Sequence, residues 1–470
     1  MSNHTLTCEQ YLDIFSTLVY ACAHASTIRP LPMIMTPIQS AFSMSGEWSQ
    51  KGDTSLGDRL LLVDATDGIA SGATIPDSAS GDGVLLLADG SRFTGQLFGA
   101  KTWGEGELVF TTGMTGYQES LTDPSFAGQV LTFTYPLIGN YGVHAGTSES
   151  AGVWPRGVVV RHAMKNPDHR NSIASISDFL AFHNVPGIEE IDTRAITRLV
   201  REHGCVLCVF GPLEDEDALR AHLGQLTSPE LEDLVEQVSI DEPVIVNEGA
   251  TDALGNPLPR IAAIDCGIKY NILRSLCCQF EVVWCPPSTT FAQAQSYGIV
   301  ALFCSNGPGD PAHPGKATSA RNTLAEAVKA NIPVMGICLG HQLLGLASGL
   351  QTYKMRYGHR GANQPCVDLE SGRVWITSQN HGFAVADPDA GMLAAHPSGA
   401  CSPAGENLHG AQAKVRFVNA NDRTVEGLDL VDRSVFTVQF HPEAAPGPHD
   451  AYPLFARFRQ MVDDHYGGVN

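Results

Sequence analysis

Basic residues are scarce in this sequence. Among 470 residues, 29 lysines and arginines stand against 50 aspartates and glutamates, for a formal net charge of -21. Nucleic acids and anionic membranes bind basic surfaces, so this balance argues against both as partners. The sequence also has no run of eighteen consecutive apolar residues, and we therefore predict no transmembrane helix.

The twelve cysteines lack the regular spacing of a disulfide framework. Scattered cysteines are typical of reduced intracellular proteins, and we expect a cytoplasmic rather than a mitochondrial location. Cys205 and Cys208 form a C-x-x-C pair, but they flank the apolar run 206–210, which predicts a buried strand. Because no second Cys or His pair completes a site, we predict no metal.

Nucleotide-binding motifs are missing as well. No G-x-G-x-x-G follows a predicted strand, and the stretch from Gly309 to Lys316 only approximates a P-loop. Its glycines are one residue too far apart, and Ala317 stands where Ser or Thr must hold magnesium. We therefore expect no cofactor in this chain.

Residues 1–82 lack a targeting pattern. The stretch 11–25 is apolar enough for a signal peptide, but Asp13 interrupts it and no basic residue precedes Arg29. The Gly, Ser and Asp-rich run from Asp64 to Asp82 is typical of a flexible linker. We expect the extension, residues 1–82, to be largely disordered.

The most informative stretch surrounds Cys338. An apolar run at 332–337 predicts a buried strand, and the leucines after Gly340 predict a helix. A nucleophile on so sharp a strand-to-helix turn needs small residues two positions away on either side, which Gly336 and Gly340 supply. A buried structural cysteine is the alternative interpretation of this pentad.

A second motif supplies the base that such a cysteine needs. His441 and Glu443 follow the apolar strand pattern 435–438. A cysteine attacks a carbonyl efficiently when an imidazole takes its proton, and a carboxylate then fixes the tautomer of that imidazole. We predict a triad of Cys338, His441 and Glu443.

These motifs resemble those of class I glutamine amidotransferases, and further stretches resemble the small subunit of carbamoyl-phosphate synthetase. The stretches that carry the second resemblance are 112–119, 135–142, 265–274, 305–311 and 378–383. The resemblance implies that Cys338 attacks the side-chain amide of L-glutamine. It also implies an oxyanion hole formed by the backbone N–H groups of Leu339 and Gly307.

The resemblance further assigns substrate contacts. The glutamine-binding positions that it implies are Gly113, Gly307, Gly309, Leu339, Gln342, Asn380, Gly382 and Phe383. At Gly113 many bacterial relatives carry Ser, so only backbone atoms remain here for a contact. Helix-start, turn or core roles are the alternatives for Gln342, Asn380 and Phe383. We expect His341 and His381 to be structural.

The chain divides into two predicted domains. Residues 83–246 show short strands, a hairpin at Asp89-Gly90 and a helix from Asp192 to Gly204, typical of an α+β domain. The resemblance gives this domain the role of docking to a synthetase subunit.

After a linker at 247–259, strands and helices alternate through 260–470, which predicts an α/β domain with a parallel sheet. A site at the carboxyl ends of the strands would bring Cys338 and His441 together. The segment from Asp387 to Val415, rich in Gly, Ala, Pro and Ser, predicts a surface insertion of low order.

The resemblance implies the function of the glutamine-hydrolysing small subunits of carbamoyl-phosphate synthetase. The implied partner is a separate large subunit that holds ATP and magnesium, and the pathway is arginine synthesis, pyrimidine synthesis or both. Two alternatives remain: an amidotransferase subunit of another synthase, and a catalytically silent regulatory or scaffold subunit.

Overall fold

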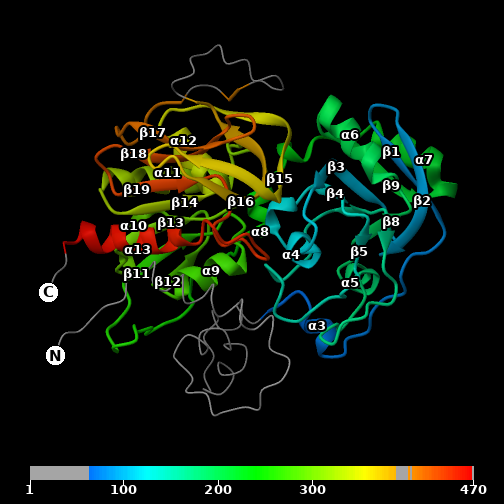
Figure 1. Ribbon diagram of the computed structural model, residues 1–470, viewed down its shortest axis with the longest axis horizontal. Helices are drawn as coiled ribbons and strands as arrows, with labels where there is room; N and C mark the ends of the chain where they lie inside the picture. Colours follow the sequence, from blue (N-terminus) through cyan, green and yellow to red (C-terminus); the bar gives the residue numbers. More distant parts are fainter. Residues whose placement is uncertain (1–62, 388–400, 403–404, 468–470) are drawn as a thin grey trace, which may run out of the picture. The chain divides into compact units, whose positions relative to one another are not determined.

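A computed structural model describes residues 63–387, 401–402 and 405–467 (Figure 1). Residues 1–62 of the predicted extension, and parts of the predicted insertion, lie outside this range. Among the described helices, the longest has 14 residues, and none is long and apolar enough to cross a membrane.

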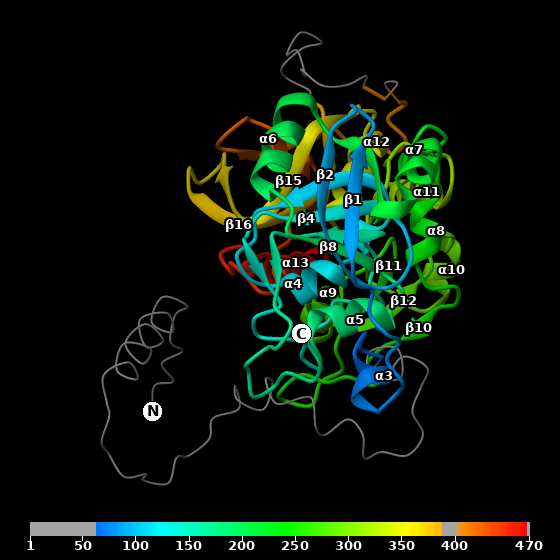
Figure 2. The same cartoon turned by 90° about the vertical axis from the view of Figure 1, so that its right-hand side faces the viewer.

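The first domain is built on a closed barrel of seven strands in the order β1-β2-β8-β6-β4-β3-β9. Figure 2 labels β1, β2, β4 and β8 of this barrel. The strands are β1 (Asp82–Leu87), β2 (Arg92–Gly99), β3 (Gly104–Thr111), β4 (Gln129–Phe133), β6 (Gly157–Val159), β8 (Pro186–Glu189) and β9 (Val206–Pro212). A separate pair, β5 (Leu137–Ile138) and β7 (His162–Ala163), forms a small parallel sheet. Closure pairs every barrel strand on both sides, so the barrel has no free edge.

Helices and 3-10 turns lie between the barrel strands or follow the last of them, β9. They are α4 (Tyr117–Leu121), η2 (Pro124–Phe126), α5 (Ile176–Phe182), α6 (Thr193–His203), η3 (Leu213–Asp215), α7 (Glu216–Leu223) and η4 (Pro229–Leu231). The side chain of Asp192 caps α6 by accepting from the N–H of Ala195, and Gly204 ends the helix with a φ of 95°. The predicted helix and the predicted hairpin between β1 and β2 are both confirmed.

The second domain contains a ten-stranded sheet in the order β10-β12-β11-β13-β14-β19-β18-β16-β15-β17. Its strands are β10 (Val244–Ile245), β11 (Arg260–Ile264), β12 (Glu281–Cys285), β13 (Ala301–Cys304), β14 (Val334–Ile337), β15 (Thr352–Asp368), β16 (Val374–Val385), β17 (Ala413–Asn419), β18 (Val425–Leu430) and β19 (Val435–Val438). The five strands from β12 to β19 run parallel, as predicted. The other strands of the sheet pair antiparallel with their neighbours. The alternation of strand and helix patterns in the sequence did not predict these antiparallel pairs.

Helices cover both faces of the parallel part of the sheet. The helices of this domain are α8 (Leu234–Val238), α9 (Tyr270–Cys277), α10 (Phe291–Ser296), α11 (Lys316–Lys329), α12 (Leu339–Ala347) and α13 (Pro453–His465). Along β11, Ile261 and Ala263 pack with α9 and α13, whereas Ala262 and Ile264 pack with α10, α11 and α12 (Figure 1). Successive side chains of a strand point to opposite faces, so a strand covered on both sides is apolar throughout.

Two parts of the predicted domain organisation are wrong: the flexible linker before the first domain and the residue at which that domain ends. The predicted flexible linker instead includes a short helix, α3 (Asp67–Ala70), and buried Ala65 and Thr66. The carboxylate of Asp64 also accepts hydrogen bonds from the N–H and hydroxyl of Ser148, at 3.1 and 2.8 Å. Burial and these bonds offset the backbone entropy that a composition rich in small residues would otherwise retain.

The first domain also ends earlier than predicted. The strand β10 lies within the range 83–246 that we assigned to the first domain, yet it pairs antiparallel with β12 of the second sheet. Val235 on α8 belongs to the core of that sheet as well. Asn247, at the start of the predicted linker, is buried and bonded to the backbone of Phe280 and Val282.

The predicted insertion is ordered in part. Residues 388–400 and 403–404 lie outside the described range, but His409 is buried and its Nε2 lies 3.0 Å from the hydroxyl of Ser348. Ala411 is also buried, and residues from Ala413 onward already belong to β17. For residues 405–415 the prediction of low order is therefore wrong, because this part packs against α12 and its sheet.

Candidate active site

The turn between β14 and α12 holds Cys338 in a strained backbone conformation. Its φ is 52° and its ψ is -100°, outside the usual regions for a residue with a side chain. A Cβ on Gly340 would lie 2.4 Å from the carbonyl oxygen of Cys304, and a Cβ on Gly336 would lie 2.8 Å from the Gly340 backbone. Both glycines are therefore needed for the turn to close, and the predicted strand, elbow and helix are confirmed.

The thiol of Cys338 is buried beside two strands. Its Sγ donates toward the carbonyl oxygen of Asn380 at 3.6 Å and accepts from Nε2 of Gln439 at 3.6 Å. The backbone N–H of Cys338 donates to the carbonyl of Val438 at 2.8 Å. The elbow is thus tied directly to β19, the strand that leads to His441.

The structure brings His441 and Glu443 to the same place. Nδ1 of His441 lies 2.7 Å from Oε1 of Glu443, and both side chains are fully buried. The other ring nitrogen, Nε2, is buried and has no hydrogen-bond partner among the described residues. A ring nitrogen left open in this way is what a base toward a neighbouring thiol requires.

The charges of this site support one another. Burial alone would lower the pKa of the His441 imidazole, but Glu443 and Cys338 together raise it above its ordinary value. Burial would raise the pKa of the Glu443 carboxyl, but Lys269 and His441 hold it well below its ordinary value. The arrangement favours an ionised Glu443 and a protonated imidazole, the form that stabilises a thiolate.

Lys269 and Asn271 are part of this site, although we assigned them no role from the sequence. Nζ of Lys269 lies 3.0 Å from Oε1 of Glu443, and Nδ2 of Asn271 donates to the Glu443 carbonyl at 2.6 Å. Lys269 is buried, and burial would lower its pKa, but Glu443 and Glu149 raise it above its ordinary value. In the sequence, Lys269 follows a predicted buried strand, at the edge of the sheet where we expected His441. This position was the signal available for its role.

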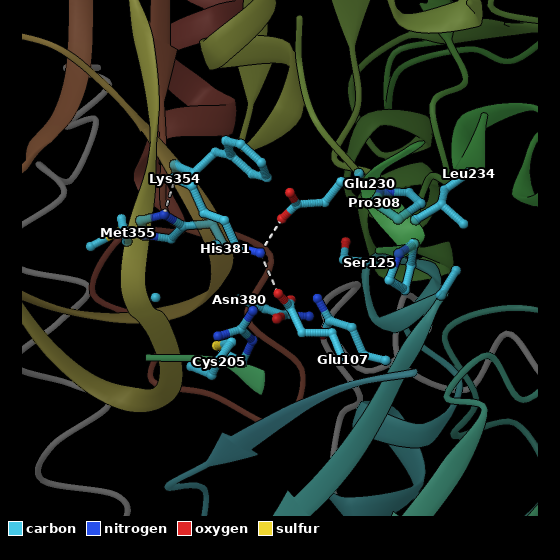
Figure 3. Close-up of a pocket in the computed structure, with 18 of the residues that line it drawn as sticks. Glu107, Ser125, Cys205, Glu230, Leu234, Pro308, Lys354, Met355, Asn380 and His381 are labelled. Atoms are coloured by element: carbon cyan, nitrogen blue, oxygen red, sulfur yellow. Dashed lines mark hydrogen bonds and ion pairs between the residues drawn. The ribbon is translucent and has the colours of Figure 1, made fainter. Parts of the chain in front are cut away.

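Cys338 lines a pocket. Figure 3 shows this pocket with Asn380, His381 and Lys354 among its labelled residues. Of the predicted positions, those that line it are Gly307, Gly309, Cys338, Gln342, Asn380, Gly382 and Phe383. Gln342 donates from Nε2 to the Phe383 carbonyl at 2.8 Å and to Oε1 of Gln439 at 3.0 Å. The elbow before α12 thus presents Cys338, and residues of neighbouring elements form the walls of the pocket.

Gly307 lies beside the side chain of Leu339, and the oxyanion hole of their backbone N–H groups stays a prediction. Leu339 is the first residue of α12, where helix N–H groups have no partner within the helix. Gly307 follows β13, and a Cβ there would lie 3.0 Å from Cδ2 of Leu339 and 1.9 Å from the Cys266 carbonyl oxygen. Only glycine fits at this position, which brings its backbone close to the elbow.

Gly113 is not among the residues that line the pocket. Its neighbour Thr112 donates from both its N–H and its hydroxyl to the carbonyl of Arg360, each at 3.1 Å. The loop that carries Gly113 is therefore attached to β15, the strand of Lys354 and Arg360. The contact of Gly113 with glutamine stays a prediction.

The first domain also contributes walls to the pocket, through residues other than the predicted Gly113. Lys354 on β15 forms ion pairs with Glu107 on β3 and with Glu230 on η4 (Figure 3). Ser125, which accepts from Nδ2 of Asn306 at 2.9 Å, lines the pocket as well. The pocket is therefore shared between the two domains.

His341 and His381 hold structural positions. Both are buried, and burial lowers the pKa of each. Nδ1 of His341 pairs with the hydroxyl of Thr437 at 2.8 Å, and Nδ1 of His381 pairs with the Phe383 carbonyl at 2.8 Å. His381 thus helps to hold the strand β16 that lines the pocket.

One cluster in the described residues has the composition of a metal site. Potential ligand atoms of His359, His381 and Glu426 lie within 4.8 Å of one another. Nε2 of His359 lies 2.9 Å from Asp422, and its Nδ1 lies 3.4 Å from Glu426. Burial would lower the pKa of His359, but these two carboxylates raise it to about 9. A protonated imidazole has no free lone pair, so these contacts describe a buried ion-pair network.

Comparison with known proteins agrees with this geometry. Residues 262–461 match the family "Glutamine amidotransferase class-I", and residues 85–210 match "Carbamoyl-phosphate synthase small chain, CPSase domain". The second domain is therefore that of a class I glutamine amidotransferase.

Relatives over most of the chain narrow the assignment. The carbamoyl phosphate synthase small chain of Methanopyrus kandleri is 42% identical over 81% of this chain and 99% of its own length. That of Methanosarcina mazei is 43% identical over 82% and 99%. A glutamine amidotransferase structure from Thermotoga maritima is 15% identical, with a TM-score of 0.32, over 45% of this chain and 99% of its own. This chain belongs to the family of carbamoyl-phosphate synthase small chains, the glutamine-hydrolysing subunit of EC 6.3.5.5.

Proposed function

We propose that this chain releases ammonia from L-glutamine with Cys338, His441 and Glu443 and passes it to a separate large subunit. The observation that carries the proposal is the strained elbow of Cys338, whose thiol interacts with the His441 imidazole, together with the 2.7 Å contact between Nδ1 of that imidazole and the buried Glu443 carboxylate. Nucleophile, base and orienting group are thus in the order that acyl transfer requires.

The reaction begins at the thiol. His441 takes the proton of Cys338 at Nε2, and the thiolate attacks the side-chain amide carbon of glutamine. Negative charge then develops on the amide oxygen, where the N–H groups of Leu339 and Gly307 stabilise it. The imidazolium gives its proton to the departing nitrogen, so that ammonia leaves and a glutamyl thioester remains.

Hydrolysis completes the cycle. A water molecule gives a proton to Nε2 of His441 and attacks the thioester carbon, and the proton returns to the sulfur as glutamate leaves. The overall change is glutamine plus water to glutamate plus ammonia. Glu443 keeps the imidazole in the tautomer that presents Nε2 to the sulfur, because it accepts from Nδ1.

Several residues that line the pocket hold the substrate glutamine. The predicted glutamine-binding positions that line the pocket together with Cys338 are Gly307, Gly309, Gln342, Asn380, Gly382 and Phe383. Gly309 has a φ of 88°, so its backbone turns in a way that a residue with a side chain rarely adopts. These backbone and amide groups hold glutamine with its side-chain amide toward the sulfur.

The partner completes the synthesis. The large subunit holds ATP and magnesium and combines the ammonia with bicarbonate to form carbamoyl phosphate, for arginine synthesis, pyrimidine synthesis or both. This chain holds no cofactor of its own and acts in the cytoplasm. The support for this division of labour is the family of small chains to which the sequence belongs. The match over 85–210 favours this partner over that of another synthase.

The test is glutamate release from glutamine by the full chain, with and without a large subunit from a related organism. We expect slow release alone, stimulation by the large subunit with ATP and bicarbonate, and loss of both activities in Cys338→Ala. Binding of the large subunit with no difference between wild type and Cys338→Ala would instead support a catalytically silent scaffold.

A further inference from the structure

One acidic residue of the first domain reaches the back of the triad. Glu149 is 1% exposed and belongs to the segment that follows β5. Its Oε2 lies 3.8 Å from Nζ of Lys269, the lysine that contacts Glu443. Neither the domain boundary nor any motif of the sequence connects Glu149 with the amidotransferase chemistry.

Glu149 also holds the start of helix α9. Its carbonyl oxygen accepts from the N–H of Tyr270 at 2.8 Å, and its Oε2 accepts from the N–H of Asn271 at 3.2 Å. The first N–H groups of a helix have no partner within the helix, and a carboxylate there also meets the positive end of the helix dipole. A residue of the first domain therefore supplies the cap of a helix of the second domain.

Lys269, which precedes the first residue of α9, and Asn271 within the helix both contact Glu443. Lys269 contacts its carboxylate at 3.0 Å, and Asn271 donates to its carbonyl at 2.6 Å. Glu149 is within reach of both, and its own backbone N–H donates to Thr122 of the first domain at 2.8 Å. The connection from the first domain to the imidazole thus runs through Glu149, Lys269 and Glu443.

We propose that Glu149 is a positioning residue for the triad, through which the first domain sets the contact between Glu443 and His441. Lys269 is shared between two carboxylates, one from each domain. Without the charge of Glu149, the ion pair with Glu443 is the one that Lys269 keeps among the described residues, and we expect the lysine to draw Glu443 away from His441. The first domain then has a role in the glutamine reaction itself, in addition to docking.

The contact between Glu443 and His441 affects the transfer of a proton from the Cys338 thiol to the His441 imidazole. Transfer of that proton from sulfur to nitrogen leaves the net charge of the pair unchanged, so it depends on what stabilises the imidazolium. Glu443 is the group that does so, at 2.7 Å. A weaker contact with Glu443 therefore makes this proton transfer less favourable and lowers the reactivity of Cys338.

The experiment measures thiol reactivity without glutamine. The full chain is treated with iodoacetamide at pH 7, and mass spectrometry follows alkylation of the peptide that contains Cys338. Because this peptide is read separately, the other cysteines do not interfere. In Glu149→Gln we expect the rate at Cys338 to fall on the order of tenfold, less than the roughly 10²-fold that a 1 Å misplacement of reacting groups can cost.

A matched control exists in the same domain. Glu189 is also buried, at 5% exposed, and accepts a backbone N–H, that of Ala163, at 2.9 Å. Glu189→Gln therefore removes a comparable buried charge and should leave the rate at Cys338 unchanged. Equal rates in wild type and both variants would overturn the proposal and leave Glu149 with a purely structural role.

A second variant covers the case in which Glu149→Gln does not fold. Glu149→Asp retains the charge but withdraws it by one methylene from Lys269 and Asn271. We expect a severalfold lower alkylation rate in this variant, and an unchanged rate would overturn the proposal. Urea unfolding of each variant, followed by circular dichroism, confirms that the molecules compared are folded.

The inference rests on the proposed function, because a positioning role presupposes a reaction at Cys338. The alkylation experiment does not depend on that function. With glutamine, Glu149→Gln should lower kcat about as much as it lowers the alkylation rate, with little change in KM. If the wild type releases no glutamate while Glu149→Gln still slows alkylation, the proposed function fails and the positioning role stands. If glutamate release is normal in both, the positioning role fails alone.

Discussion

Asn380 and Asp123 join the two domains at the wall of the pocket. Nδ2 of Asn380, on β16, donates to Oδ2 of Asp123 at 2.9 Å, although 257 positions separate them in the chain. The other oxygen of Asp123 caps η2 by accepting from the N–H of Ser125. A side chain that we expected to contact glutamine is therefore itself held by the first domain.

The first prediction concerns this contact. Asp123→Ala removes the acceptor of Asn380, whose side chain then becomes free to turn away from the pocket. We expect KM for glutamine to rise about tenfold with a smaller change in kcat, because a buried hydrogen bond to a charged group contributes roughly 1.5 to 3 kcal/mol. Steady-state glutamate release measures both constants. Asp82→Ala, an exposed carboxylate of the same domain bonded to Gln96, is the control that should leave KM unchanged.

The second prediction concerns pH and Lys269. Lys269 helps to hold the pKa of Glu443 below its ordinary value, so the carboxylate stays ionised as the medium becomes acidic. In Lys269→Met this support is lost, the pKa of Glu443 rises, and the acidic limb of kcat/KM should move to higher pH. A profile of kcat/KM from pH 5 to 9 tests this. An acidic limb at the wild-type position would show that Lys269 does not influence the carboxylate.

The third prediction concerns stability and His359. Burial would lower the pKa of His359, but Asp422 and Glu426 raise it to about 9, above the roughly 6.5 of an unfolded chain. A raised pKa contributes stability that is complete below about pH 6.5 and is lost as the pH rises through 9.

The urea concentration at the unfolding midpoint of the wild type should therefore decrease as the pH rises from 6.5 to 9. In Asp422→Asn the ion pair is weakened, so the midpoint at pH 6.5 should be lower and its decrease toward pH 9 smaller. Circular dichroism in urea at the two pH values measures this difference. The same decrease in both proteins would contradict the assignment of a protonated His359.

The fourth prediction concerns the elbow. A Cβ on Gly340 would lie 2.4 Å from a backbone oxygen of Cys304, so Gly340→Ala must displace α12 or β13. We expect a loss of about 1 to 3 kcal/mol in the free energy of unfolding, as for other overpacked interiors, and a loss of glutamate release of more than tenfold. Gly224→Ala is the control, since its Cβ would meet nothing closer than 3.5 Å. Equal activity in both variants would contradict the argument.

The features predictable from the sequence are those that depend on neighbours along the chain. The elbow at Cys338 needs small residues at 336 and 340, and steric contact within one turn explains both. The same holds for the hairpin at Asp89-Gly90 and for α6, whose cap at Asp192 and end at Gly204 are local. Local sterics and hydrogen bonds act before any long-range contact forms, so their signature is present in the residues themselves.

What the tertiary structure alone decided depends on which distant surfaces meet. Nothing near Val244 indicates that β10 joins the second sheet, and nothing near Asp64 indicates that its carboxylate binds Ser148. The contacts of Lys269 with Glu149 and Glu443 likewise join residues more than one hundred positions apart. Such pairings form because burial of shared apolar surface offsets the entropy of closing long loops, a balance that no local pattern records.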